Sequence, residues 1–181
     1  MKTRREFIHG LILSVGGAAT LSACGDNAPA VTATAPHNPG RFYTGDEMAL
    51  VNRVSDLIIP RTETPGALDV NVAGYLDGLM SDWASADTQN AHRAALARLR
   101  ADLDAAVGVP FERATQAAAE EALTDLDARA FEIDQSMEEG YRRFKGFITQ
   151  AYFATEDGAV QELKWVALPG RWDPSVDITP A

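Results

Sequence analysis

Apolar residues recur every three or four positions from Arg41 onward, the spacing that places them on one face of an amphipathic helix. No stretch alternates apolar and polar residues with a period of two, and β-branched residues are sparse. The pattern therefore predicts an all-α fold, a small bundle of about five to six helices.

Capping residues and helix breakers set the expected helix limits. The sequence Thr-Gly-Asp-Glu at residues 44–47 has the form of a capping box, and Pro60 is expected to end the helix that follows. Four more helices are expected, from Asn71 to about Met80, from Asp87 or Thr88 to Gly108, from Thr115 to about Leu126, and from about Phe131 to Tyr152, the last being the longest. Thr155 can cap a short helix that runs to Trp165.

The apolar stripes of these helices identify the expected core. Its members are Met48, Val51, Val54, Ile58, Val72, Tyr75, Leu76, Leu79, Met80, Leu96, Leu99, Leu103, Val107, Ile133, Met137, Tyr141, Phe144, Ile148 and Tyr152. His92, in the first turn of the third helix, is placed opposite the leucines and is expected to face solvent.

The first residues have the features of an export signal. Arg4 and Arg5, followed by Phe7, match the twin-arginine address, and residues 10–23 form a weakly apolar stretch that is too short for a membrane span. A soluble N-terminal helix is the alternative, but Gly16 and Gly17 would weaken it. We expect residues 1–23 to be a twin-arginine signal peptide, which directs a folded protein to the periplasm.

The sequence Leu-Ser-Ala-Cys at residues 21–24 resembles a bacterial lipobox, which predicts lipidation of Cys24 and attachment to a membrane. Ordinary cleavage that leaves Cys24 as a free thiol is the alternative. The Pro- and Ala-rich sequence that follows indicates a flexible tether, so residues 24–43 are assigned to the lipidated N-terminus and tether, and residues 44–181 to the helical domain.

Charge and cysteine content exclude several classes of protein. The formal net charge is -10, so a nucleic acid is not expected as a partner, and neither are anionic headgroups through charge alone. Cys24 is the only cysteine, which excludes a disulfide within the chain, a zinc site with several thiolates and a cysteine-ligated iron–sulfur cluster.

No catalytic or cofactor-binding motif is found in the domain. His92 is its only histidine and has no recognisable nucleophile or orienting partner. The glycine-rich phosphate-binding sequences are absent, and neighbouring acidic residues such as Glu120 and Glu121 do not face one another on a helix. We therefore expect no catalytic residue, metal or cofactor in this chain.

The C-terminal segment carries two tryptophans among proline and glycine residues. Trp165 and Trp172 either fold back over the helices or form a surface for a partner, since tryptophan is enriched at interface anchors. The sequence leaves both readings open.

Two blocks of the chain resemble the gluconate 2-dehydrogenase subunit 3 family. Residues 57–80, LIIPRTETPGALDVNVAGYLDGLM, are similar to its pattern of a helix ending in I-I-P, then T-x-T-P-G-A, then a second helix. Residues 146–163, GFITQAYFATEDGAVQEL, are similar to its late segment, although no serine stands between Thr155 and Glu156. The Pro- and Gly-rich ending is similar in kind.

The resemblance implies a non-catalytic small subunit of a periplasmic dehydrogenase. In that family the partner is a large FAD-dependent oxidoreductase of the glucose–methanol–choline (GMC) type, electrons usually pass to a cytochrome c, and the small subunit carries the export signal for both chains. FAD would then be bound by the partner. The residues expected at the partner interface are Pro60, Thr64, Pro65, Gly66, Tyr152, Phe153, Thr155, Gly158, Trp165 and Trp172.

Two other functions compete with this one. A self-sufficient lipoprotein, acting as a ligand-binding or envelope scaffold module, needs the same signal and tether but no flavoprotein. A free-standing enzyme is hard to reconcile with one histidine and no recognisable set of catalytic residues.

Overall fold

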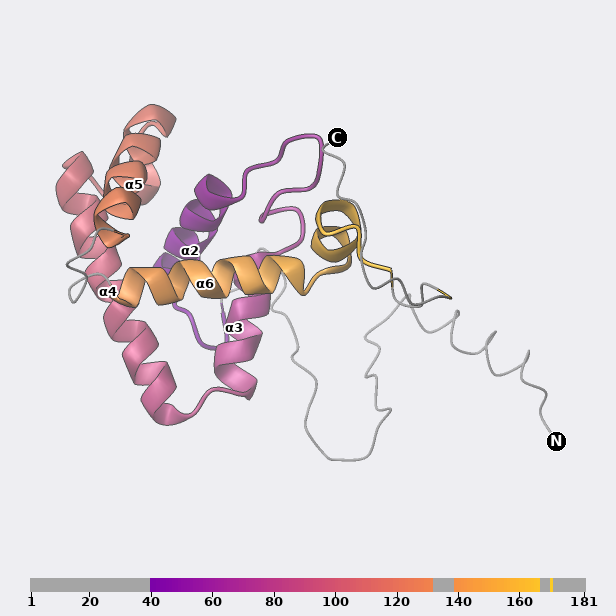
Figure 1. Cartoon of the computed structure of the whole chain (residues 1–181). Helices are drawn as coiled ribbons and strands as arrows, with labels where there is room; N and C mark the ends of the chain where they lie inside the picture. Colours follow the sequence, from indigo (N-terminus) through magenta and orange to yellow (C-terminus); the bar gives the residue numbers. More distant parts are fainter. Residues whose placement is uncertain (1–39, 132–138, 167–169, 171–181) are drawn as a thin grey trace.

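The computed structural model describes residues 40–131, 139–166 and 170 (Figure 1). Its helices are α2 (Gly45–Ile58), α3 (Val72–Asp82), α4 (Ala86–Val107), α5 (Gln116–Ala130) and α6 (Glu139–Phe153), with a 3-10 turn, η1 (Phe111–Arg113), and a wider π turn, η2 (Gly158–Glu162). The described residues contain no strand, and the all-α prediction is confirmed. None of the described helices is long and apolar enough to cross a membrane.

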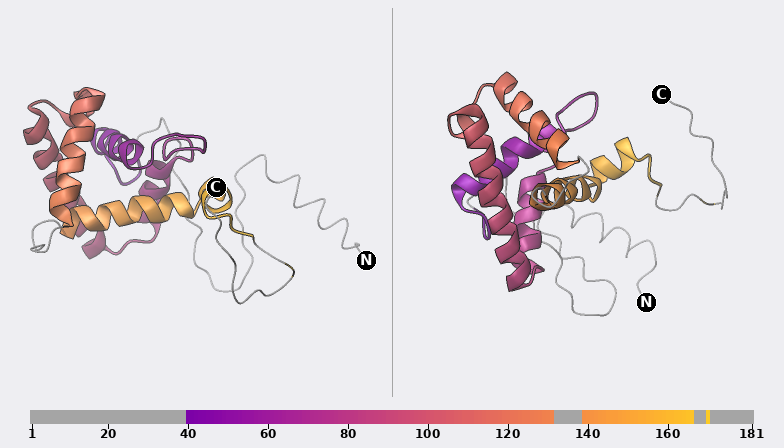
Figure 2. Two further views of the ribbon diagram at one scale, coloured as in Figure 1. Left: turned by 45° about the horizontal axis from the view of Figure 1, so that its top comes forward. Right: turned by 60° about the vertical axis from the view of Figure 1, so that its left-hand side comes forward.

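Helix α6 joins the two ends of the molecule. It packs against α4, α3 and α5 and contacts η2, which follows it in the chain. Helix α2 packs against α3 and α5. In Figures 1 and 2, α4 and α5 lie at one end of α6, whereas η2 and the loop between α2 and α3 lie at the other.

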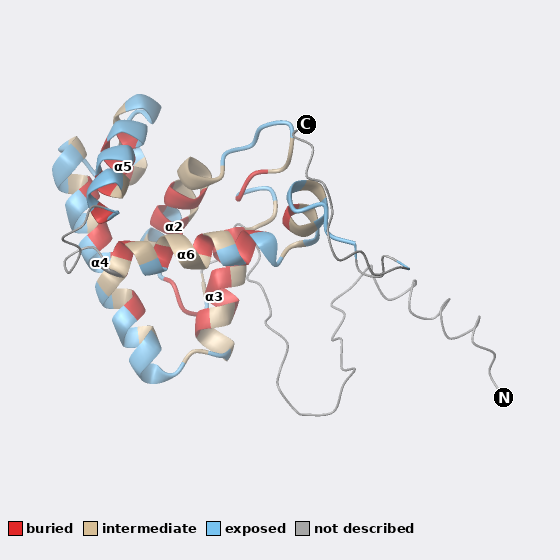
Figure 3. Ribbon diagram, viewed as in Figure 1, coloured by how far each residue is buried: buried red, intermediate tan, exposed pale blue. Residues whose placement is uncertain are grey.

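The core forms where these helices face one another (Figure 3). Most of the predicted apolar positions are buried there, and the partly buried exceptions are Ile58, Tyr75, Leu79 and Val107. Ile133 and Met137 lie outside the described residues. The predicted stripes therefore identify most of the core.

Side-chain caps fix most of the helix starts. The Thr44 capping box is formed as predicted, and Asn71 caps α3 from a left-handed backbone conformation with φ 54°. Thr115 caps α5, and Gly108 ends α4 with φ 74°.

The expected start of α4 was wrong. Neither Asp87 nor Thr88 is the N-cap, because the Ser85 side chain accepts a hydrogen bond from the Thr88 backbone N–H and the helix begins at Ala86. Serine, aspartate and threonine are all favourable N-cap residues. Ser85, Asp87 and Thr88 were therefore equally plausible caps from the sequence.

The later helices also differ from their predicted limits. Helix α5 continues past Leu126 to Ala130, and Phe131 is its C-cap rather than the start of the next helix. The described part of α6 begins at Glu139, and residues 132–138 lie outside the described residues. Among the described helices α4, with 22 residues, is the longest.

Candidate functional site

The loop between α2 and α3 is held in one shape by its own hydrogen bonds. The Ala67 N–H donates to the Ile59 carbonyl over 2.9 Å, and the Asp69 carboxylate accepts from the Gly66 N–H and pairs with Arg61. A Cβ atom on Gly66 would lie 2.5 Å from the Arg61 nitrogen, so only glycine fits this turn. Pro65 and Gly66 therefore lie in an ordered, closely packed loop.

The segment after α6 is shaped by two predicted residues. The Thr155 hydroxyl accepts a hydrogen bond from the Gly158 N–H over 3.1 Å and caps the turn that contains η2. A Cβ atom on Gly158 would lie 2.3 Å from the Tyr152 carbonyl oxygen, which explains a glycine at this place. The expected short helix after Thr155 is thus present, but most of it is the wider π turn, and it ends at Glu162 rather than at Trp165.

These two segments meet, although they are far apart in sequence. The Tyr152 hydroxyl donates to the Pro65 carbonyl over 2.7 Å, and the Thr64 hydroxyl bonds the Glu162 carboxylate. Figures 1 and 2 show the loop beside η2 in each view. We call residues 60–70 together with residues 152–166 the composite surface.

The predicted interface residues divide into two groups on the composite surface. Gly66, Tyr152 and Gly158 are buried, so their part is to hold the two segments together. The residues that reach solvent are Pro60, Phe153 and Trp165, which are exposed, and Thr64, Pro65 and Thr155, which are half-buried. Trp172 lies outside the described residues.

Trp165 does not fold back into the core of the described domain. Its side chain is 58% exposed. Sequence reasoning missed four exposed apolar neighbours on the composite surface, namely Leu68, Val160, Leu163 and Val166. The sequence held a signal for their exposure. Val160, Leu163 and Val166 follow α6 in a stretch whose apolar residues do not form a single helical stripe.

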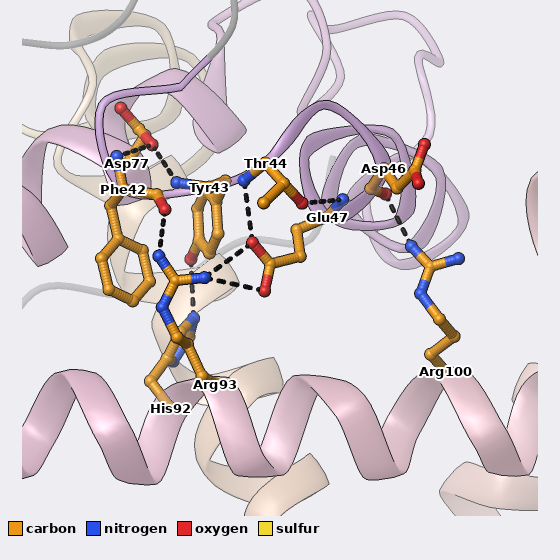
Figure 4. Close-up of polar contacts among 9 residues, drawn as sticks. All are labelled: Phe42, Tyr43, Thr44, Asp46, Glu47, Asp77, His92, Arg93 and Arg100. Atoms are coloured by element: carbon orange, nitrogen blue, oxygen red, sulfur yellow. Dashed lines mark hydrogen bonds and ion pairs between the residues drawn. The ribbon is translucent and has the colours of Figure 1, made fainter.

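A second cluster anchors the residues that precede α2 (Figure 4). The Asp77 side chain is fully buried, and its carboxylate accepts the backbone N–H groups of Arg41, Phe42 and Tyr43 at 2.8, 2.9 and 2.8 Å. A Cβ atom on Gly40 would lie 2.4 Å from the Asp77 oxygen. We call Asp77 and residues 40–43 the N-terminal anchor.

Arg93 of α4 closes the N-terminal anchor from the other side. Its guanidinium donates to both Glu47 carboxylate oxygens at 3.0 and 2.9 Å and to the Phe42 carbonyl. It also lies 4.2 Å from the centre of the Phe42 ring. Since Glu47 also belongs to the capping box, the start of α2 and the residues before it are fixed to α3 and α4 together.

The prediction that His92 faces solvent was wrong. Its side chain is only 6% exposed, and its Nε2 shares a 2.7 Å hydrogen bond with the Tyr43 hydroxyl (Figure 4). The rings of Phe144 and Phe147 also lie against it. His92 precedes Leu96, Leu99 and Leu103 by four, seven and eleven residues, so it extends the leucine stripe rather than opposing it.

Burial of His92 predicts a loss of stability in weak acid. Burial is the main cause that lowers the pKa of His92 from its usual 6.5 to about 4, while nearby Glu47 opposes the shift and Arg93 contributes to it. The neutral ring is favoured in the folded protein, so the stabilisation is complete above pH 6.5 and is lost as pH falls toward 4. The total is about 3 kcal/mol.

The check is the free energy of unfolding by denaturant at several pH values, for the wild type and for His92→Gln. Glutamine can still bond Tyr43 but does not titrate, so the difference between the two proteins should change by about 3 kcal/mol between pH 6.5 and 4. A constant difference would mean that folding does not lower the pKa of His92.

The described residues show little that resembles an active site. They contain no group of three His, Cys, Asp or Glu side chains placed to hold a metal ion. A pocket of about 330 Å³ lies between α4 and α6, lined by His92, Phe144, Phe147 and the exposed Arg98, among others. It offers aromatic surface, the cationic side chains of Arg98 and Arg143 and the carboxyl group of Asp102, but no nucleophile beside a base.

Comparison with known proteins gives one match. A model of the family described as gluconate 2-dehydrogenase subunit 3 matches residues 45–170, well over half of the chain. Searches of curated proteins and of solved structures found no match. The matched range starts with α2 and includes both segments of the composite surface. The chain therefore belongs to the gluconate 2-dehydrogenase subunit 3 family, whose name describes one subunit of a dehydrogenase.

Proposed function

We propose that this chain is the non-catalytic small subunit, export escort and stabiliser of a periplasmic FAD-dependent dehydrogenase of the GMC type, which oxidises a sugar, a sugar acid or a glycoside. The observation that carries the proposal is the composite surface in a member of a dehydrogenase-subunit family. This surface combines a backbone held by hydrogen bonds with large apolar side chains that are exposed to solvent.

The exposed side chains support a docking role on energetic grounds. Trp165 and Leu163 are each 58% exposed, and covering such side chains gains roughly 25 cal/mol for each Å² of apolar surface. Exposed apolar residues gathered in one region mark interaction sites, whereas scattered ones are ordinary. The hydrogen bonds that join the two segments fix the shape of the surface before binding, which lowers the entropic cost of binding.

The N-terminal sequence supports the escort role. Arg4 and Arg5 match a signal for the export of folded proteins, yet the chain shows no cofactor-binding motif of its own. A bound flavoprotein is the folded cargo that accounts for this signal. FAD is then held by the partner, and a cytochrome c subunit accepts the electrons. Lipid on Cys24 keeps the complex at the membrane.

Capture of the full-length chain from membranes tests this function. A tagged wild-type chain is expected to bring down a large protein whose absorbance spectrum shows bound flavin. Trp165→Ala with Leu163→Ala should lower its yield roughly tenfold or more, because central apolar anchors carry most of the binding energy. The helical content and thermal midpoint of the purified chain should not change.

A matched control is Trp83→Ala with Val109→Ala. These side chains are 48% and 46% exposed, and the two residues flank α4, the helix at the opposite end of α6 from η2. This control should leave the flavoprotein yield unchanged. A chain that brings down no flavoprotein, or a yield that falls equally in both double variants, would contradict the proposed function.

The alternative is a self-sufficient lipoprotein that binds a small ligand. The pocket between α4 and α6 is the observation that favours it. That function predicts a stable monomer after gentle extraction, with no flavin in the eluate and a ligand that protects the aromatic residues of the pocket. The same capture experiment therefore separates the two functions.

A further inference from the structure

The composite surface has an apolar centre that is distinct from the rest of the described domain. Most of the large apolar side chains that are exposed in the described residues belong to it, namely Leu68, Phe153, Val160, Leu163, Trp165 and Val166. The others, Trp83, Val109 and Phe131, are separate from it in sequence and lie on other elements. This concentration indicates one docking face.

The charges around this centre are mainly negative. The composite surface carries five carboxylates, from Glu63, Asp69, Glu156, Asp157 and Glu162, and two cationic side chains, from Arg61 and Lys164. Arg61 is already paired with Asp69 on the same surface, and the Lys164 ammonium donates to the Gln161 carbonyl. The surface therefore presents an excess of negative charge to a partner.

Two of these carboxylates are placed to meet an incoming cation. Glu63, in the loop, and Glu156, after α6, are exposed and form no hydrogen bond or ion pair within the described part of the chain. Each belongs to one of the two segments that meet at Pro65 and Tyr152. Unpaired charges beside an apolar centre suit the rim of an interface, where they steer the approach of an oppositely charged face.

We infer that the partner face that docks here has an apolar centre and a basic rim, with Lys or Arg side chains opposite Glu63 and Glu156. The inference rests on the proposed function and specifies the chemistry of the flavoprotein surface. A partner with an acidic rim would bring like charges together and would be disfavoured. The other possible occupants of this face are a second copy of this chain and the chain's own residues 171–181.

Charge reversal on the composite surface tests the inference. The probe is the flavoprotein captured with the full-length chain, separated from it and allowed to rebind. Glu63→Lys with Glu156→Lys should lower the association rate roughly tenfold or more at low salt, because electrostatic steering acts on encounter. The deficit should shrink toward 1 M salt, where the Debye length is only about 3 Å.

The matched control is Glu121→Lys with Asp125→Lys. Both residues are exposed on α5, at the end of the molecule away from η2, and the control changes the net charge by the same amount. It should rebind close to the wild-type rate at low salt. Gel filtration of all three proteins should give the same elution volume, and their thermal midpoints should agree.

Several results would overturn the inference. Equal slowing in both double variants would mean that net charge, not this rim, governs encounter. A flavoprotein that rebinds Glu63→Lys with Glu156→Lys at the wild-type rate would show that the rim does not face basic residues, while leaving the proposed function intact.

Other occupants of the face would also be detected. If the wild-type chain forms a dimer that the Trp165→Ala variant does not form, the face belongs to a second copy. Faster binding after removal of residues 171–181 would assign it to the tail. Absence of any flavoprotein would refute the proposed function, and the inference with it.

Discussion

Replacing Asp77 by alanine is expected to destabilise the protein by about 3–5 kcal/mol, a large share of the stability of a domain of this size. The buried carboxylate is the hydrogen-bond acceptor for three consecutive backbone N–H groups, those of Arg41, Phe42 and Tyr43. Its removal leaves buried donors without an acceptor, and each such donor costs about 1–3 kcal/mol. Asp77→Asn should cost less, because one oxygen remains to accept.

The measurement is the free energy of unfolding from denaturant titration at pH 7. Limited proteolysis gives a second readout, because loss of the N-terminal anchor should expose residues 40–43 to cleavage first. Asp82→Asn is the matched control, since Asp82 pairs with the side chain of Arg41, which is 44% exposed, and should cost less than about 1 kcal/mol. If Asp77→Ala is no more harmful than Asp82→Asn, the anchor contributes little.

Under the proposed function, replacing Arg4 and Arg5 by lysine is expected to leave both this chain and the flavoprotein partner in the cytoplasm. The twin-arginine route reads the two arginines themselves, so the change keeps the charge but removes the signal. The measurement is flavoprotein and dehydrogenase activity in separated periplasmic and cytoplasmic fractions. Most of both should move to the cytoplasm.

Two controls separate export from anchoring and from general damage. Arg98→Lys with Arg143→Lys makes the same exchange at exposed positions of α4 and α6 and should leave export unchanged. Cys24→Ser should retain export but release the complex from the membrane. Flavoprotein that reaches the periplasm normally without the two arginines would contradict the escort role.

Local features of the fold were predictable because their causes lie within one or two helical turns. The capping box at Thr44, the left-handed Gly108 and the apolar stripes all depend on neighbours three or four residues away. The start of α4 was predicted less well because Ser85, Asp87 and Thr88 are all suitable caps. In such cases tertiary packing chooses among locally equivalent options.

His92 shows a signal that was present in the sequence but misread. It shares the stripe of Leu96 and Leu99, and this spacing alone predicts burial. What the spacing does not contain is the partner, because the Tyr43 hydroxyl comes from a segment 49 residues away. Asp77 poses the same difficulty, since its partners are backbone groups that no side-chain pattern identifies.

The candidate interface was predictable as two sequence blocks but not as one surface. The contact between Pro65 and Tyr152 depends on the path of α6 across α3 and α4, which local sequence does not determine. For the same reason the sequence could not separate the buried supports, such as Tyr152, from the exposed contacts, such as Trp165.

The hydrogen bond between Pro65 and Tyr152 also determines when the composite surface can form during synthesis of the chain. It joins residues 87 positions apart, so the composite surface cannot exist until nearly the whole domain has been synthesised. The proposed export signal at Arg4 and Arg5, by contrast, is synthesised first. Under the proposed function, a partner that docks on this surface therefore binds a finished domain rather than a growing chain, and export of the complex follows that binding. A route for folded cargo allows such a delay, whereas one that threads chains during synthesis does not.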